Sequence, residues 1–166
     1  MIVLGIDPGI ANTGYGVVAG TGSRLQAAEF GVIETSPSAP AEARLAEIHA
    51  DVGELIRRHD VEAVAVEDLY FGANVVSAMA VGQARGVVLL AAGQLGIPVR
   101  AYTPQQVKAA VCGSGRADKS QVGRMVARLL GMSSPPRPDH AADALAVAVC
   151  ELNRAPLAGA IAGAAR

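Results

Sequence analysis

The chain has 166 residues, of which 51% are hydrophobic and 17% charged, which suits one globular domain and excludes disorder over the whole length. Its apolar runs are interrupted before they reach the roughly 20 residues that a membrane-spanning helix needs, so we expect no transmembrane segment and no membrane partner. No basic leader precedes the first apolar run, and the two cysteines form no redox or metal motif, so we expect a cytoplasmic protein.

Charge is distributed unevenly along the chain. Residues 1–70 contain four Arg and eleven Asp or Glu, whereas residues 71–166 contain ten Lys or Arg and four acids. An acidic region that can hold divalent cations, beside a basic surface that can hold phosphates, is typical of metal-dependent nucleic-acid chemistry. The alternative is an imbalance without functional meaning.

The first part of the chain predicts three strands, a helix and a fourth strand. Residues 2–7 are an apolar run that ends in an acid before a Pro-Gly turn, and residues 14–20 and 24–35 form a β-rich hairpin. Apolar residues recur every three or four positions in 41–59, which predicts an amphipathic helix. Residues 61–66 then form a buried strand, which the helical crossover places parallel to the first strand.

A long helix and a fifth strand follow. The helix is predicted for residues 74–95, and its Gly82 and Gly86 lie four apart on one face, which allows another backbone to approach closely. Residues 97–102 form the strand.

The remaining chain predicts three helices. Capping boxes at Thr103 and Asp118 begin two helices that end near residues 112 and 131. Asp139 begins a last helix that reaches residue 152, and the small residues after it predict a flexible C-terminal tail, residues 154–166.

This order of elements predicts one α/β domain, residues 1–153, with a mixed five-stranded sheet and helices on both faces. That layout is ribonuclease H-like.

Four residues that can carry chemistry come from three separate places in the predicted fold. Asp7 and Glu67 end two parallel strands, so their carboxylates can emerge at the same edge of the sheet. His140 and Asp143 lie three apart at the start of the last helix and share a face that can reach both acids. Taken singly, Asp7 or Glu67 could instead cap a turn. The helix dipole favours an acid at the start of a helix, which is enough to explain why Asp139 is present.

Three carboxylates and one imidazole form an oxygen-rich set of ligands that suits Mg²⁺, tolerates Mn²⁺ and is a poor site for zinc. Two such ions about 3.5 to 4 Å apart can activate a water and stabilise the leaving oxygen of a phosphodiester. The four residues therefore indicate nuclease chemistry.

Several longer blocks of the sequence resemble the RuvC family of Holliday junction resolvases. The resemblance covers about residues 1–153, and its blocks occur in the family's order and at its spacing. They are GIDPG at 5–9 followed by Asn12, Thr13, Gly14 and Gly16, VED at 66–68 followed by an aromatic at 70, GQARG at 82–86, TPQQVKAAVCGSGRADKSQV at 103–122, and HAADALAVA at 140–148.

The resemblance implies an endonuclease that nicks two strands of equal polarity in a four-way DNA junction. It places the family's four catalytic and metal-binding positions on Asp7, Glu67, His140 and Asp143. Many members have Asp at the third position, so His140 is a departure that lowers the negative charge of the site and favours Mn²⁺. A pairing of Asp139 with Asp143, four residues apart, is the alternative for this helix.

Residues shortly after Glu67 are candidates for contacts with DNA. Tyr70 matches the aromatic that the family uses at the junction centre, where a ring can stack on an unpaired base. Phe71 is the neighbouring candidate, and Asn74 lies on the same loop. Packing in the core or in the loop is the alternative role for both rings.

Basic residues later in the chain are candidates for contacts with phosphates. Lys108 and Lys119 match family positions that contact the DNA backbone near the active site. Four arginines can extend that surface, since each neutralised phosphate adds salt-dependent affinity: Arg85, Arg116, Arg124 and Arg128. A solvated helix face is the alternative role for the last two.

Cleavage of two strands needs two sites, so we expect a twofold homodimer with the helix of Gly82 and Gly86 as its interface. The family also implies action on four-way junction DNA beside the RuvA and RuvB branch-migration proteins.

Two other classes of protein fit parts of the sequence. GIDPGIANTG also resembles the first phosphate loop of actin-like ATPases and kinases, but the sequence contains no second copy of this pattern. A catalytically silent junction-binding relative would not need the intact acids.

Overall fold

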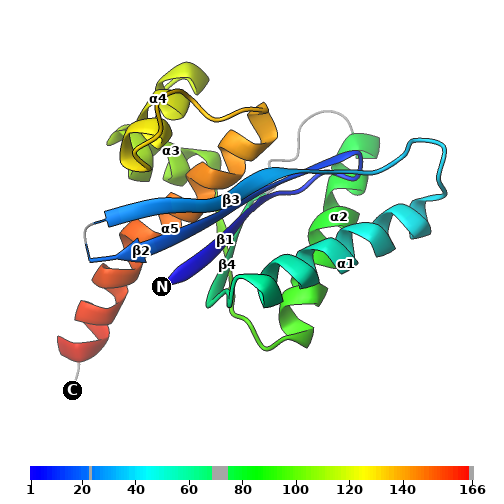
Figure 1. Ribbon diagram of the computed structural model, residues 1–166, viewed down its shortest axis with the longest axis horizontal. Coiled ribbons are helices and arrows are strands. Elements are labelled where there is room, and N and C mark those ends of the chain that lie inside the picture. Colours follow the sequence, from blue (N-terminus) through cyan, green and yellow to red (C-terminus); the bar gives the residue numbers. More distant parts are fainter. Residues whose placement is uncertain (23, 69–74, 165–166) are drawn as a thin grey trace.

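The residues described in this computed structural model, 1–22, 24–68 and 75–164, form a five-stranded sheet in the order β3-β2-β1-β4-β5, with helices on its two sides (Figure 1). The strands are β1 (Ile2–Asp7), β2 (Asn12–Thr21), β3 (Arg24–Glu34), β4 (Ala63–Glu67) and β5 (Val99–Tyr102). The helices are α1 (Ala41–Arg58), α2 (Val75–Gln94), α3 (Pro104–Cys112), α4 (Lys119–Leu129) and α5 (Asp139–Ala164).

The sheet is mixed, as the sequence predicts. β1 pairs antiparallel with β2, and β2 with β3. β4 runs parallel to β1, and β5 parallel to β4, because α1 and α2 provide the crossovers between them. The parallel part of the sheet therefore brings the ends of β1 and β4 to one edge.

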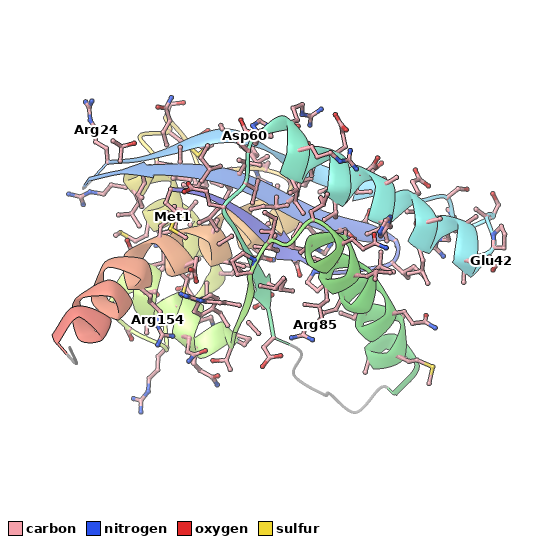
Figure 2. All side chains as sticks on the ribbon, turned by 90° about the horizontal axis from the view of Figure 1, so that it is seen from below. Met1, Arg24, Glu42, Asp60, Arg85 and Arg154 are labelled. Atoms are coloured by element: carbon pink, nitrogen blue, oxygen red, sulfur yellow. The ribbon has the colours of Figure 1, made fainter. Side chains whose placement is uncertain are left out.

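Alternate residues of the central strands point into two cores, and side chains fill the space on both faces of the sheet (Figure 2). Leu4 and Val64 belong to the core that includes residues of α1 and α2. Val3 and Ala65 belong to the core that includes residues of α3, α4 and α5. The predicted arrangement, with helices on both faces of the sheet, is confirmed.

Helix α5 lies unusually close to β1 and β2 because glycines form the surface beneath it. A Cβ on Gly5 would lie 2.0 Å from the carbonyl oxygen of Ala144, and a Cβ on Gly14 would lie 2.1 Å from that of His140. A side chain at either position would collide with the helix backbone. The first turns of α5 are therefore placed on the sheet by contact between backbones.

A buried carboxylate connects α5 to β5. Glu151 is 1% exposed, and it accepts hydrogen bonds from the Tyr102 hydroxyl and from Arg100 Nη1, the latter at 3.0 Å. Burial is the main reason that the pKa of Tyr102 rises to about 12, so its hydroxyl stays protonated and continues to donate. The guanidinium of Arg154 lies 5.6 Å from the centre of the Tyr102 ring. The middle of α5 is thereby tied to the strand next to β4.

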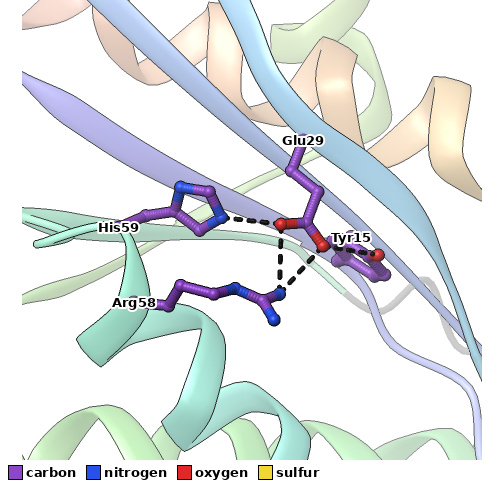
Figure 3. A network of polar contacts seen from close by, with 4 residues as sticks. All are labelled: Tyr15, Glu29, Arg58 and His59. Carbon is purple, nitrogen blue, oxygen red and sulfur yellow. Dashed lines mark hydrogen bonds and ion pairs between the residues drawn. The ribbon is translucent and has the colours of Figure 1, made fainter.

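A polar network ties the hairpin of β2 and β3 to the end of α1 (Figure 3). Glu29 accepts hydrogen bonds from the Tyr15 hydroxyl at 3.1 Å and from Arg58 Nη2 at 2.9 Å, and its other oxygen lies 2.8 Å from His59 Nε2. The hydrogen bond with His59 is the largest effect that lowers the pKa of Glu29, which keeps the carboxylate ionised. The network fixes the point where α1 ends and the chain turns toward β4.

The C-terminal helix differs from the prediction. α5 continues past residue 152 to Ala164, so residues 155–164 are helical, which corrects the expectation that the last helix ends at 152. Alanine is the strongest helix former, and its abundance here outweighs the signals for a frayed end. The domain boundary at 153 and the flexibility of residues 154–166 stay predictions.

Among the described residues, no helix combines the length and apolar character that crossing a membrane requires.

Candidate active site

Asp7 and Glu67 lie next to each other at one edge of the sheet. They are the last residues of β1 and β4, and the parallel register pairs Ile6 with Val66, the residues just before them. Both acids are partly buried, and the Asp7 side chain is 18% exposed. The structure thus brings together two of the four predicted catalytic residues.

His140 joins Asp7 from the first turn of α5. Its Nδ1 lies 2.7 Å from Asp7 Oδ2, which is hydrogen-bond distance, while 49% of the His140 side chain stays exposed. The backbone of His140 rests on Gly14 of β2, a contact that the sequence reasoning missed. Its signal was the Gly-Tyr-Gly alternation within β2, which leaves one face of that strand without side chains at positions 14 and 16.

Asp143 is paired with Lys119 instead. Lys119 Nζ lies 3.1 Å from Asp143 Oδ2 and 3.2 Å from Asp139 Oδ2. Although partial desolvation acts to lower the pKa of Lys119, its hydrogen bonds with the two carboxylates raise it overall, so the ammonium stays charged. Sequence reasoning missed this pairing. Its signal was a lysine at the first position of α4, where the helix dipole disfavours a cation unless acids lie nearby.

Glu67 faces a cavity of about 190 Å³ between these groups. The cavity is also lined by Asp143, Lys108 and Lys119, with apolar residues of α3, α4 and α5. Burial, and then the negative charges of Asp7 and Asp143, raise the pKa of Glu67 to about 7, against the opposing effect of both lysines. Burial also raises the pKa of Asp7, although the hydrogen bond with His140 opposes it. Burial and the neighbouring carboxylates therefore oppose the ionisation of Glu67, and a bound cation would favour it.

The acidic side chains of the site are not arranged around one common point. Within the part of the chain that the structure describes, no three His, Cys, Asp or Glu side chains are close enough together to hold a metal ion. The contacts explain this arrangement, because Asp7 is bonded to His140 and Asp143 to Lys119. The site thus consists of two pairs of groups, Asp7 with His140 and Asp143 with Lys119, together with Glu67.

The predicted DNA-binding residues fall into three groups. Lys108 and Lys119 line the cavity of Glu67. Arg85 projects from α2 toward the end of β4, with its Nη2 3.5 Å from Asp68 Oδ1 (Figure 2). Arg116 is not in this cavity but in a separate groove beside α4. The predictions for Tyr70, Phe71 and Asn74 lie outside the described residues.

The predicted dimer interface lies on α2. Gly86 is exposed, and a Cβ there would meet no atom within 4 Å, while Gly82 is half-buried. Met79 is 63% exposed and Leu90 53% exposed on the same face. The opposite face packs in the core. Sequence reasoning missed these two apolar residues, although their spacing from Gly86, seven residues for Met79 and four for Leu90, was the signal.

Fold and site together define a ribonuclease H-like protein with an acidic site suited to phosphodiester chemistry. The family model for "Crossover junction endodeoxyribonuclease RuvC" matches residues 3–151. RuvC of Moorella thermoacetica is 53% identical over 156 residues, which are 94% of this chain and 93% of that protein. The chain belongs to the RuvC family of crossover junction endodeoxyribonucleases.

Solved structures agree with this assignment. A Thermus thermophilus RuvC structure superposes with a TM-score of 0.89 at 46% identity, covering 95% of this chain and 97% of that one. T. thermophilus RuvC in complex with a Holliday junction substrate superposes with a TM-score of 0.91 at 45% identity, covering 95% and 96%. The yeast mitochondrial Holliday junction resolvase Ydc2, at 15% identity and a TM-score of 0.62, shares the fold.

Proposed function

We propose that the chain resolves four-way (Holliday) DNA junctions in recombination and repair by metal-dependent hydrolysis of phosphodiester bonds at Asp7, Glu67, His140 and Asp143. The observation that carries the proposal is the cavity of Glu67, in which acids and lysines meet. Acids can hold cations and ammonium groups can hold phosphates, and phosphodiester hydrolysis needs both. The T. thermophilus relative bound to a Holliday junction supports the choice of substrate.

The donor set fits divalent cations. Three carboxylates offer hard oxygen ligands, and burial, followed by the charges of Asp7 and Asp143, raises the pKa of Glu67, which a bound cation would lower. We infer that Asp7, Glu67, His140 and Asp143 hold two Mg²⁺ ions, with Mn²⁺ able to replace them through the imidazole. When bound, such ions supply an activated water and neutralise the charge that develops on the departing oxygen.

The protein's own groups do the binding and orienting. Asp7 engages Nδ1 of His140, so Nε2 is the ring nitrogen left for another ligand. Lys108 and Lys119 are placed to hold phosphates of the strand that enters the cavity. Lys119 also neutralises Asp143 and Asp139 in the protein alone, so its ammonium can exchange these carboxylates for a DNA phosphate.

Two nicks require two sites, and we propose a twofold homodimer through the exposed face of α2. The face combines an exposed glycine with exposed apolar side chains, Gly86 with Met79 and Leu90. Burying them against the same face of a second copy would remove apolar surface from water and allow close helix contact. The proposal also includes a cytoplasmic location and action beside RuvA and RuvB.

A labelled four-way junction tests the function directly. With Mg²⁺ or Mn²⁺ the protein should introduce paired nicks, and a linear duplex of the same sequence should stay intact. Asp7→Asn should slow cleavage more than about 100-fold, because it removes a metal ligand, yet it should still bind the junction in EDTA, because affinity comes mainly from basic groups. Asp51→Asn on the exposed side of α1 is the matched control and should cleave normally. Near-normal cleavage by Asp7→Asn, or hydrolysis of ATP in place of DNA, would contradict the proposal.

A further inference from the structure

A second cavity, of about 630 Å³, lies along α4 and shares no lining residue with the cavity of Glu67. Residues from the end of α3, the following loop and one face of α4 line it. We call it the α4 groove, and its polar and larger apolar lining residues are Ser114, Arg116, Gln121, Arg124, Met125 and Arg128.

The α4 groove and the acidic site lie on opposite faces of the same helix. Lys119 and Val122 face the cavity of Glu67, whereas Arg124 and Arg128 face the groove. A helix with its side chains is about 10–12 Å across. One branched DNA molecule can therefore reach both places at once.

The charge of the groove is of one sign. Three arginines line it and no carboxylate does. Among the described residues, Arg116 and Arg128 make no ion pair with a carboxylate, and Arg124 donates to the hydroxyl of Ser120. The acid closest in sequence, Asp118, accepts a hydrogen bond from the backbone N–H of Gln121 as the cap of α4. The guanidinium groups thus remain available to an external anion.

The spacing of the arginines fits a chain of phosphates better than a single small anion. Arg124 and Arg128 are one turn apart on α4, a rise of about 6 Å, and Arg116 lies before the helix begins. The three arginines are therefore spaced out along the chain, one before α4 and two on it. Guanidinium forks bind phosphate oxygens in pairs, so such a row suits successive phosphates of a nucleic-acid backbone.

We propose that the α4 groove binds the sugar-phosphate backbone of a duplex arm of the junction, at phosphates other than the scissile one. The proposal rests on the proposed function and adds a second DNA-binding surface to it. Junction DNA is the occupant that the arrangement favours over an acidic protein, because α4 itself joins the groove to Lys119 in the cleavage site. Contacts on both faces of α4 would hold two segments of one branched DNA molecule around the helix. A linear duplex has no second segment in the required direction, so it should bind less well.

Salt-dependent binding of the junction in EDTA gives the first measurement. Arg124→Gln with Arg128→Gln should reduce the magnitude of the slope of log K against log salt by about 2, and should weaken binding on the order of tenfold near 0.1 M salt. Both side chains are exposed, so folding should be unaffected, which a melting curve checks. Arg24→Gln with Arg57→Gln removes the same charge from β3 and α1 and should leave the slope as in the unmodified protein. An unchanged slope in the groove variant would overturn the proposal.

A scan of single methylphosphonates along each junction arm locates the contact. The unmodified protein should lose affinity at two or three neutralised phosphates away from the cleaved bond, and the groove variant should show no further loss at those positions. If every methylphosphonate weakens both proteins equally, the arginines act elsewhere and the proposal is wrong. Cleavage of the junction by the unmodified protein in the same series tests the proposed function separately. If the unmodified protein does not cleave, the proposed nuclease activity is wrong, whatever the binding data say about the groove.

Discussion

The two halves of the acidic site are held in different ways. Asp7 and His140 form a hydrogen-bonded pair between a strand end and a helix backbone that rests on Gly14. Asp143 is held by an ion pair with Lys119, whose side chain is 61% exposed and shared with Asp139. The first half is positioned by packing and the second by charge.

The difference indicates which half can rearrange. Ion pairs between exposed groups contribute little to stability and exchange easily with other ions. Backbone packing resists displacement, because a close-packed contact has no room to shift. We therefore expect the Asp7–His140 half to act as a fixed platform, and the Lys119–Asp143 half to open when a cation and DNA arrive.

Loss of the imidazole tests the fixed half most severely. His140→Ala should slow cleavage at least 10- to 100-fold, because a ligand and its hydrogen bond to Asp7 are both lost. His140→Asp should remain active with a preference shifted toward Mg²⁺, and Asp139→Ala should lose little. Single-turnover rates with each metal measure these effects. If Asp139→Ala is inactive while His140→Ala cleaves normally, Asp139 is the ligand.

A methyl group at the contact with α5 tests whether packing sets the position of His140. Gly14→Ala places a Cβ against the His140 carbonyl, so we expect a loss of about 1–3 kcal/mol in the free energy of unfolding, together with slower cleavage. Gly93→Ala on α2 meets no atom within 4 Å and should be neutral or stabilising. Denaturant unfolding compares the two variants. Equal stability of Gly14→Ala and the unmodified protein would show that α5 moves freely on the sheet.

The raised pKa of Glu67 predicts that the stability of the metal-free protein depends on pH. Its pKa is about 7 in the folded state against an ordinary value of 4.5. The folded protein holds this proton more tightly, so its contribution to stability is full below pH 4.5, falls as pH rises toward 7 and is absent above it. Glu67→Gln should remove this fall, on the order of 1–3 kcal/mol. The difference in unfolding free energy between the two proteins in EDTA, from pH 4.5 to 8, measures it. A difference that does not vary with pH would contradict the raised pKa of Glu67.

The exchangeable half should give the smallest effect. Lys119→Ala should weaken junction binding modestly and reduce the magnitude of the salt slope by about 1, because one phosphate contact is lost. Titration of the junction at several salt concentrations measures it, with Arg24→Ala on the distant hairpin as the control. A slope equal to that of the unmodified protein would mean that Lys119 serves only to pair the acids.

The elements that carry the site could be predicted because each has a local signal. β1 and β4 are apolar runs that end in Asp7 and Glu67, and their parallel pairing follows from the helix between them. The capping boxes at Thr103 and Asp118 are both formed, with Gln106 and Gln121 as partners. Short-range chemistry decided these features, so a single sequence was enough.

The contacts inside the site could not be predicted in the same way. His140 and Asp7 are 133 residues apart, and whether they bond depends on how closely α5 approaches the sheet. Lys119 reaches acids of another helix, which its own neighbours in the sequence do not reveal. The buried Glu151 is a similar case, because its partners Tyr102 and Arg100 lie on β5. Three-dimensional packing settles each of these contacts.

The contact of α5 with the glycines of β1 and β2 also separates what can be engineered from what cannot. Since backbone atoms meet there, repacking the hydrophobic core with different side chains offers no means of adjusting the Asp7–His140 distance. We expect metal preference to change with the residue at position 140, and affinity for DNA to change with the basic side chains of α3 and α4. A laboratory that wants a resolvase with altered substrate range should randomise those two helices and leave the small residues beneath α5 unchanged.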